Sequence, residues 1–142
     1  MSDPWILVVD DNDDDVELTK RAFRKCGFTQ RLEIARDGVA ALARLCADGV
    51  AQPAFVLLDL NMPRINGIEV VQRLRGDPRT RAIPIIVLTS SREPSDLAGA
   101  YAAGANSYVR KPIEFDRFVE VVRQIGGYWL SLNEPAPREP AA

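Results

Sequence analysis

The sequence contains no histidine among its 142 residues. Histidine is the side chain that most readily exchanges protons near neutral pH, and it is the commonest metal ligand in proteins. Its absence excludes histidine-based acid–base catalysis and metal sites built on histidine. Any catalytic or metal chemistry of this chain must therefore come from other side chains.

Cysteine is also scarce, and the chain has only Cys26 and Cys46. Their separation fits neither a zinc site nor a CxxC redox motif, so we interpret both as buried, reduced thiols on helices. No apolar run approaches the roughly 20 residues of a membrane span. The N-terminus lacks the basic region and cleavage site of a secretory signal. We therefore expect a cytoplasmic protein that does not contact a membrane.

The chain carries no large excess of either charge, since 18 basic and 20 acidic side chains leave a net charge of −2. Nucleic-acid-binding surfaces are typically basic, and no helix-turn-helix is present, so nucleic-acid binding is not expected. A hydrophobic content of 46% and a charged content of 27% are typical of a globular domain. The length fits one such domain.

Short apolar runs alternate strictly with amphipathic segments along the chain. Strands are expected at 5–9, 31–35, 54–58, 83–88 and 107–110, and helices at 12–27, 38–49, 66–78, 93–105 and from Glu114 onward. Five strand–helix units in this order predict an α/β fold, a doubly wound parallel sheet with helices on both faces. The third helix should bury Ile68, Val71 and Leu74 on one side. Residues 1–132 would form the domain, and the proline-rich tail 133–142 is expected to be disordered.

Polar or charged residues stand at the carboxyl ends of four of the five expected strands: Asp10 with Asp11, Asp59, Thr89 and Lys111. In open parallel sheets, sites form beyond these ends. If the first and third strands are neighbours, about 4.8 Å apart, their carboxylates converge. Any one of these residues could be a solvated strand end or a helix cap, but the complete set indicates a site.

The formal charges of this set indicate phosphoryl chemistry with a metal. Asp10, Asp11 and Asp59 together with Lys111 sum to −2, which one divalent cation would neutralise. Mg²⁺ prefers such oxygen ligands and keeps waters that a phosphate can replace. A carboxylate such as Asp59 can attack phosphorus, and Thr89 and Lys111 can stabilise the transferred group. The neighbouring run Asp13 to Asp15 is interpreted instead as first-turn helix charge.

Four segments together resemble the motif set of response-regulator receiver domains, the CheY-like family: LVVDDN, VLLDLNMPRINGIE, IIVLTSS and AGANSYVRKP. The resemblance covers about residues 5 to 130. It implies the flavodoxin-like strand order 2-1-3-4-5. It also implies that Asp59 is the phosphoacceptor, and that Asp10, Asp11, Asp59 and the backbone carbonyl of Asn61 bind Mg²⁺ or Mn²⁺. Asp11 would be a more direct ligand than Asp10.

The same resemblance implies roles for five residues in or just after the fourth and fifth strands. Thr89, Ser90 and Lys111 would bind the phosphoryl group. Tyr108 would be the switch aromatic that turns inward as Thr89 moves. The bond between Lys111 and Pro112 is expected to be cis, which proline makes tolerable.

The expected function is that of a single-domain response regulator in a two-component phosphorelay. A sensor histidine kinase would be the phosphoryl donor, and the output would be changed protein–protein contacts. The segments FVEVVRQIGGYWLSLNEP and DNDDDVELTKRAF are similar to regulators paired with phytochrome kinases, so a bacteriophytochrome is one candidate partner. The chain would not be an enzyme beyond slow self-dephosphorylation.

Three alternatives remain open at this point. An aspartate-based phosphohydrolase needs a second acid two residues after the nucleophile, where this chain has Asn61. A nucleotide or flavin module would need a phosphate-binding glycine motif, and neither GxxxxGK nor GxGxxG follows the first strand. A pseudo-receiver, a pure interaction module, would not accept phosphate, and acetyl phosphate labelling would distinguish it.

The last helix is expected to make the chain a homodimer. Phe115, Phe118, Val119, Val122 and Ile125 form one stripe that can pack on the sheet, and a second apolar set comprises Val121, Tyr128, Trp129, Leu130 and Leu132. A helix that is apolar on more than one face needs a second partner. The alternative is that Trp129 folds back onto its own domain, which a break at Gly126 and Gly127 would allow.

Overall fold

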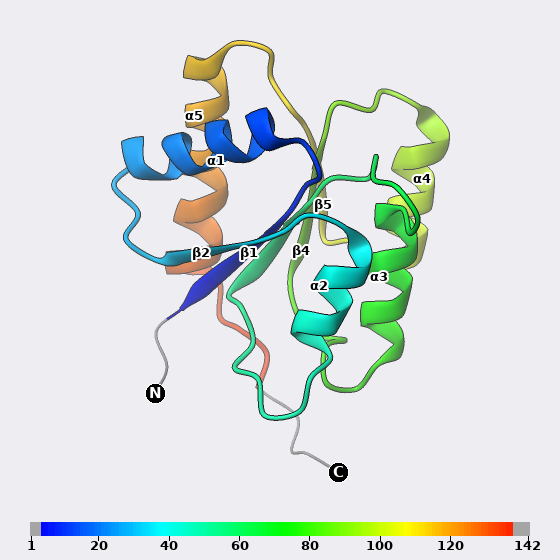
Figure 1. Ribbon diagram of the computed structural model, residues 1–142. Coiled ribbons are helices and arrows are strands. Elements are labelled where there is room, and N and C mark those ends of the chain that lie inside the picture. The colour runs from blue at the N-terminus through cyan, green and yellow to red at the C-terminus, as the bar shows by residue number, and fades with distance from the viewer. Residues whose placement is uncertain (1–3, 138–142) are drawn as a thin grey trace.

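A five-stranded parallel sheet forms the centre of the computed structural model, which describes residues 4–137 (Figure 1). The strand order is β2-β1-β3-β4-β5. The strands are β1 (Trp5–Val9), β2 (Arg31–Ala35), β3 (Phe55–Leu58), β4 (Ile85–Thr89) and β5 (Ser107–Arg110). The predicted α/β fold and its flavodoxin-like order are confirmed.

Burial of the strands follows their sequence patterns. Every residue of β1, β3 and β4 is buried, as expected for continuous apolar strands that are covered on both faces. β2 is only partly buried and lies at one edge of the sheet. Its sequence, RLEIA, alternates polar and apolar residues, which is typical of a strand that is covered less completely than the central ones.

Five α-helices within residues 4–137 cover the two faces of the sheet (Figure 1). α1 (Asp13–Lys25) and α5 (Phe115–Gly127) lie on one face, and α2 (Gly38–Leu45), α3 (Gly67–Gly76) and α4 (Pro94–Ala103) lie on the other. Ile6 and Val8 of β1 pack in the core under α1 and α5, whereas Leu7 and Val9 pack under α2 and α3. The alternation of side chains along each strand thus separates two cores.

Two local predictions on the α2–α3 face were wrong. α2 ends at Leu45 instead of Gly49. Beyond the helix, the Ala51 carbonyl accepts a hydrogen bond from the Trp5 indole N–H at 3.0 Å. Ile68 does not share the buried face of α3 with Val71 and Leu74, since it packs instead against the cluster under α4. Val70 takes the predicted place of Ile68.

A short π-helix, η1 (Tyr128–Leu132), continues α5. Trp129 and Leu130 are half-buried against the α1–α5 core, so the tryptophan lies on its own domain. Tyr128 and Leu132 remain 48% and 75% exposed. The predicted dimer through this region stays a prediction.

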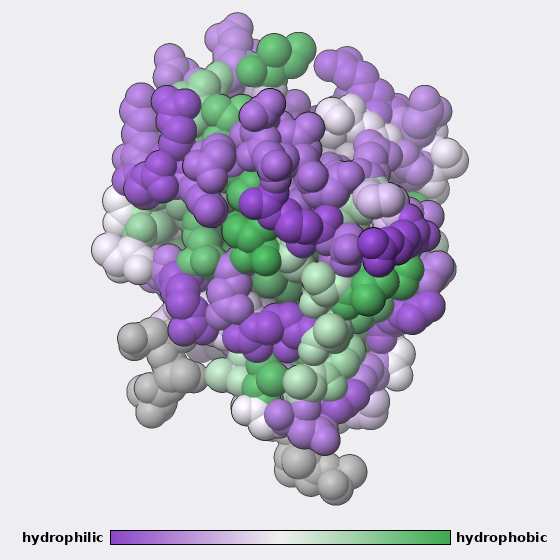
Figure 2. All heavy atoms as spheres, in the orientation of Figure 1, coloured by the Kyte–Doolittle hydropathy of each residue, from purple (hydrophilic) through white to green (hydrophobic). Residues whose placement is uncertain are grey.

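The tail beyond η1 has neither helix nor strand at residues 133–137, and residues 138–142 lie outside the described part, so its predicted disorder stays a prediction. Cys26 and Cys46 are half-buried free thiols. Within residues 4–137, no helix is long and apolar enough to cross a membrane. The upper half of the face shown in Figure 2, over α1 and the carboxyl ends of the strands, is mostly hydrophilic.

Candidate functional site

The predicted site residues meet at the carboxyl edge of the sheet. Asp10 and Asp11 follow β1, Asp59 follows β3, Thr89 is the last residue of β4, and Lys111 follows β5. Parallel ladder bonds hold this edge together: the backbone N–H of Asp59 donates to the Val9 carbonyl at 3.0 Å, and that of Lys111 donates to the Thr89 carbonyl at 2.9 Å. The alignment of the strands therefore sets the spacing of the side chains.

Three carboxylates form the acidic part of the site. One oxygen from each of Asp10, Asp11 and Asp59 lies within 4.8 Å of the others. Asp10 and Asp59 are buried, whereas Asp11 is exposed. The backbone N–H of Asn12 donates to Asp10 at 3.0 Å, and that of Asn61 donates to Asp59 at 3.3 Å. A cluster of fixed oxygen donors with one side open to solvent fits a hard divalent cation that keeps water ligands.

The Lys111 ammonium reaches into this cluster and is held by carboxylates. Its Nζ lies 2.8 Å from Asp10, 3.1 Å from Asp15 and 3.5 Å from Asp59. Burial of the ammonium opposes its charge, but the hydrogen bond to Asp10 and the charges of Asp59 and Asp10 outweigh burial, so the pKa of Lys111 is raised. The lysine is therefore a firmly charged group beside the Asp59 carboxylate.

The sequence interpretation missed Asp15 as a member of the site. Asn12 caps α1 by accepting from the Asp15 backbone N–H at 2.9 Å, which places the first helical turn beside Lys111. Asp15 precedes the buried residues Thr19 and Ala22 by four and seven positions. That helical spacing puts all three on one face and could have indicated an inward carboxylate.

A second group, after β4, connects Thr89 to α4 and β5. Thr89 is fully buried, and its hydroxyl oxygen accepts a hydrogen bond from the Ser91 backbone N–H at 3.3 Å. The Ser91 hydroxyl donates to Asp96 in the first turn of α4 at 2.6 Å. The half-buried Tyr108 donates to the Ser91 carbonyl at 3.3 Å. Ser91, which the sequence analysis did not single out, thus joins these elements, whereas the predicted Ser90 is exposed.

The predicted cis bond between Lys111 and Pro112 is wrong. Within residues 4–137 no peptide bond is cis. The trans form of a bond before proline is more stable by about 0.5–1 kcal/mol. Lys111 reaches Asp10 and Asp59 with this bond in the trans form, so the position of its ammonium does not require the cis isomer.

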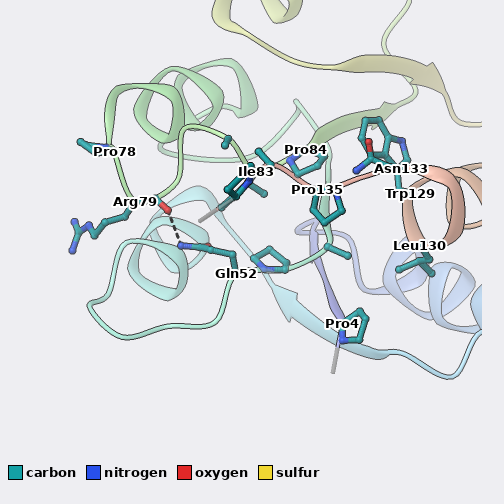
Figure 3. A pocket seen from close by; sticks show the side chains of 15 residues that line it. Pro4, Gln52, Pro78, Arg79, Ile83, Pro84, Trp129, Leu130, Asn133 and Pro135 are labelled. Carbon is teal, nitrogen blue, oxygen red and sulfur yellow. Dashed lines mark hydrogen bonds between the residues drawn. The ribbon is translucent and has the colours of Figure 1, made fainter. Parts of the chain in front are cut away.

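A hollow of about 300 Å³ lies at the amino-terminal ends of the strands, opposite the acidic cluster (Figure 3). Its walls include Pro4 and Pro84, which precede β1 and β4, and Trp129 with the tail residue Pro135. None of its lining residues belongs to the acidic cluster. The polar site at the carboxyl edge is therefore separate from this apolar hollow.

A family model, sequence relatives and solved structures all indicate one protein family for this chain. Residues 6–123 match the family described as response regulator receiver domain. The probable methanogenesis regulatory protein FilR2 of Methanothrix harundinacea is 44% identical over 95% of this chain and 90% of that protein. Response regulator Rcp1 of Synechocystis is 33% identical over 88% of each chain.

Two solved structures are similar over nearly their whole length. The phosphorylated cyanobacterial phytochrome response regulator RcpA has a TM-score of 0.88 at 28% identity, covering 96% of this chain and all of that one. The Mn²⁺-bound form of Rcp1 has a TM-score of 0.85 at 30% identity, covering 95% and 100%. With the sheet order, the acidic cluster and the lysine in place, this chain belongs to the response regulator receiver family.

Proposed function

We propose that this chain is a phosphoacceptor in a two-component phosphorelay, and that Asp59 takes the phosphoryl group from a sensor histidine kinase. The observation that carries the proposal is the placement of the Asp59 carboxylate. It lies 3.5 Å from the Lys111 ammonium and within 4.8 Å of carboxylate oxygens of Asp10 and Asp11. Receiver domains generally act as phosphoacceptors and are not enzymes in their own right.

The transfer forms one bond and breaks one. A carboxylate oxygen of Asp59 attacks phosphorus, the bond from phosphorus to the donor breaks, and the donor leaves with that electron pair. With acetyl phosphate the leaving group is acetate, and with a kinase it is the histidine nitrogen. Lys111 and the Thr89 and Ser90 hydroxyls would bind the phosphoryl oxygens, because this transfer depends mainly on alignment and neutralised charge.

The acidic cluster would hold Mg²⁺ or Mn²⁺ through Asp10, Asp11, Asp59 and the backbone carbonyl of Asn61. Bound there, the ion would neutralise charge on the transferred group. The residues present fit this role, since all the side-chain donors are oxygens and Asp11 faces solvent. A phosphoryl group brings roughly −1.5 to −2 of charge into an already negative pocket, so phosphorylation should require the metal.

Labelling with acetyl phosphate tests the proposal directly. The wild-type chain should gain one phosphoryl group, detected as about 80 Da by intact-mass spectrometry, in magnesium buffer. Asp59→Asn should gain none. Asp48→Asn is a matched control, because its side chain is 95% exposed and pairs with Arg79 away from the site. Labelling of Asp59→Asn at the wild-type rate would contradict the assignment, and absence of labelling in the wild type would favour a pseudo-receiver.

The hydrolase alternative finds no support in the geometry. An amide at Asn61 cannot serve as the general acid that such an enzyme needs two residues after its nucleophile. The Asn61 backbone N–H donates to Asp59. Steady turnover of a chromogenic phosphate ester would contradict this argument and support a hydrolase.

We also propose a phytochrome-type kinase as the partner class, on the basis of the structural likeness to a phytochrome response regulator. FilR2, which is named for methanogenesis, has the higher sequence identity and points to another pathway. Phosphotransfer from a purified bacteriophytochrome kinase, compared over the first minute with transfer from an unrelated histidine kinase, distinguishes the two. A rate preference for the phytochrome kinase supports this partner, and equal rates contradict it.

A further inference from the structure

The Asp15 carboxylate shares the Lys111 ammonium with two members of the acidic cluster. Its distance to Lys111 Nζ is 3.1 Å, against 2.8 Å for Asp10 and 3.5 Å for Asp59. Asp15 itself is not part of the three-carboxylate cluster. Including it changes the formal charge of the group from −2 to −3.

The backbone of Asp15 is fixed while its side chain is not enclosed. Its N–H is held by the Asn12 cap at 2.9 Å, and its carbonyl accepts from the Thr19 hydroxyl at 2.8 Å. The Asp15 side chain is 39% exposed, compared with 5% for Asp10 and 10% for Asp59. Of the three carboxylates on Lys111, Asp15 is therefore the one that can turn to water without displacing the acidic cluster.

We propose that Asp15 is a positioning residue that holds the Lys111 ammonium on the α1 side of the pocket and releases it when Asp59 is phosphorylated. This inference rests on the proposed function of Asp59 and Lys111. A new phosphoryl oxygen must compete with Asp15 for the same ammonium. Asp15 also adds a like charge near the incoming donor. Both effects oppose phosphorylation, so Asp15 acts as a restraint on the resting protein.

The neighbouring aspartates provide matched controls on the same helical turn. Asp13 pairs with Arg36, and neither Asp13 nor Asp14 contacts Lys111. Asp14→Asn removes the same charge from the same turn as Asp15→Asn. A difference between these two variants isolates the contact with Lys111 from the general charge of the α1 N-terminus.

The first experiment measures the initial rate of acetyl phosphate labelling at saturating magnesium. Asp15→Asn should label about threefold faster than wild type or more, in the range typical of coupled contacts. Asp14→Asn and Asp15→Glu should stay near the wild-type rate, the latter because it restores a carboxylate. Equal acceleration by Asp14→Asn, or no acceleration by Asp15→Asn, would overturn the inference while leaving Asp59 phosphorylation established. If the wild type is not labelled at all, the result contradicts the proposed phosphoacceptor function of Asp59, which the Asp15 inference assumes.

The second experiment needs no phosphorylation and detects the contact itself. The ¹H–¹⁵N correlation of the Lys111 ammonium should show protons protected from exchange with water in wild type and in Asp14→Asn. Asp15→Asn should exchange faster by about threefold or more, because the amide that replaces the carboxylate carries no charge and holds the ammonium less firmly. Thermal unfolding of each variant verifies that the fold is kept. Unchanged exchange in a folded Asp15→Asn protein would show that Asp15 does not hold Lys111.

Discussion

The hydroxyl of Tyr108 donates a hydrogen bond to the backbone carbonyl of Ser91 at 3.3 Å. The N–H of the same Ser91 donates to the Thr89 hydroxyl at 3.3 Å. One residue thus contacts both the proposed phosphoryl-binding threonine and the proposed switch aromatic. A shift of Thr89 toward a phosphoryl group would pull directly on the contact that orients Tyr108.

The first prediction concerns this coupling. Thr89→Ala should still be labelled by acetyl phosphate, because Asp59 is unchanged, but the Tyr108 ring should no longer respond. Measuring Tyr108 ring resonances before and after labelling tests it, with Thr29→Ala as control because Thr29 is exposed in the loop between α1 and β2. If the Tyr108 signals of labelled Thr89→Ala shift as in wild type, Thr89 is not the coupling residue.

The second prediction concerns the metal. Asp11→Ala should weaken Mn²⁺ binding more than Asp10→Ala, and EDTA should stop phosphorylation of the wild type. Loss of an oxygen ligand lowers affinity for hard cations, and Asp10 also serves as the closest partner of Lys111, at 2.8 Å. Titration with Mn²⁺, followed by the proton relaxation of water, measures the Mn²⁺ dissociation constant of each variant. Equal labelling rates with and without metal would contradict the charge argument.

The third prediction concerns Gly67, at the start of α3. A Cβ at this position would lie 2.7 Å from the Asp59 carbonyl oxygen and 2.8 Å from Leu60 Cα. Gly67→Ala should therefore destabilise the fold by about 1–3 kcal/mol, the usual cost of overpacking, and slow labelling because it displaces the Asp59 backbone. Urea unfolding measures the first effect.

Gly76→Ala, at the other end of the same helix, is the control. A Cβ there would meet nothing within 4 Å. It should stabilise the protein by about 0.4–1 kcal/mol, since alanine restricts the unfolded chain more than glycine does. Destabilisation by both variants to the same extent would contradict the proposed close approach at Gly67.

The fourth prediction concerns the dimer. Of the five residues expected at an interface, Tyr128 and Leu132 are exposed, whereas Val121, Trp129 and Leu130 pack on their own core. Tyr128→Ser with Leu132→Ser should therefore convert a dimer to monomer in sedimentation at micromolar concentration, with Asp59 labelling intact. Trp129→Ala should lower stability as well. A wild type that is monomeric at all accessible concentrations would end the proposal.

The fifth prediction concerns acid stability. Hydrogen bonds from the Arg79 side chain and backbone lower the pKa of Asp77 to about 2. A depressed carboxyl pKa stabilises the fold above the unfolded value, and this contribution is lost as the pH falls through about 4 to 2. Because the Arg79 partner is largely exposed, the contribution should be at most about 1 kcal/mol. Urea unfolding at pH 6 and 2.5 should show Asp77→Asn losing less stability than wild type on acidification.

Sequence reasoning predicted that Asp10, Asp59, Thr89 and Lys111 lie together because each stands at the carboxyl end of a strand, and the structure brings them to one end of the sheet. In a parallel sheet such positions meet at one edge whatever the details of packing. The family resemblance implied the strand order, and the structure confirms it. Because that order makes β1 and β3 neighbours, the proximity of Asp10 and Asp59 could be predicted without knowledge of side-chain contacts.

Asp15 and Ser91 could not be placed in the same way. Whether Asp15 meets Lys111 depends on the angle at which α1 leaves β1, which the cap at Asn12 sets in three dimensions. Ser91 acts through its backbone as much as its hydroxyl, and backbone contacts carry no residue-type signal.

The hollow in Figure 3 also has a consequence for engineering the chain. Pro4 and Pro137 both line it, so the two ends of the described chain border the same hollow, at the amino-terminal ends of the strands and away from the acidic cluster. Chain ends that lie close together allow circular permutation. A short linker across the hollow, with new ends opened beside the exposed Asp48 between α2 and β3, would leave every carboxyl strand end uncut. Such a rearranged chain could carry a reporter domain on each new end without obstructing Asp59.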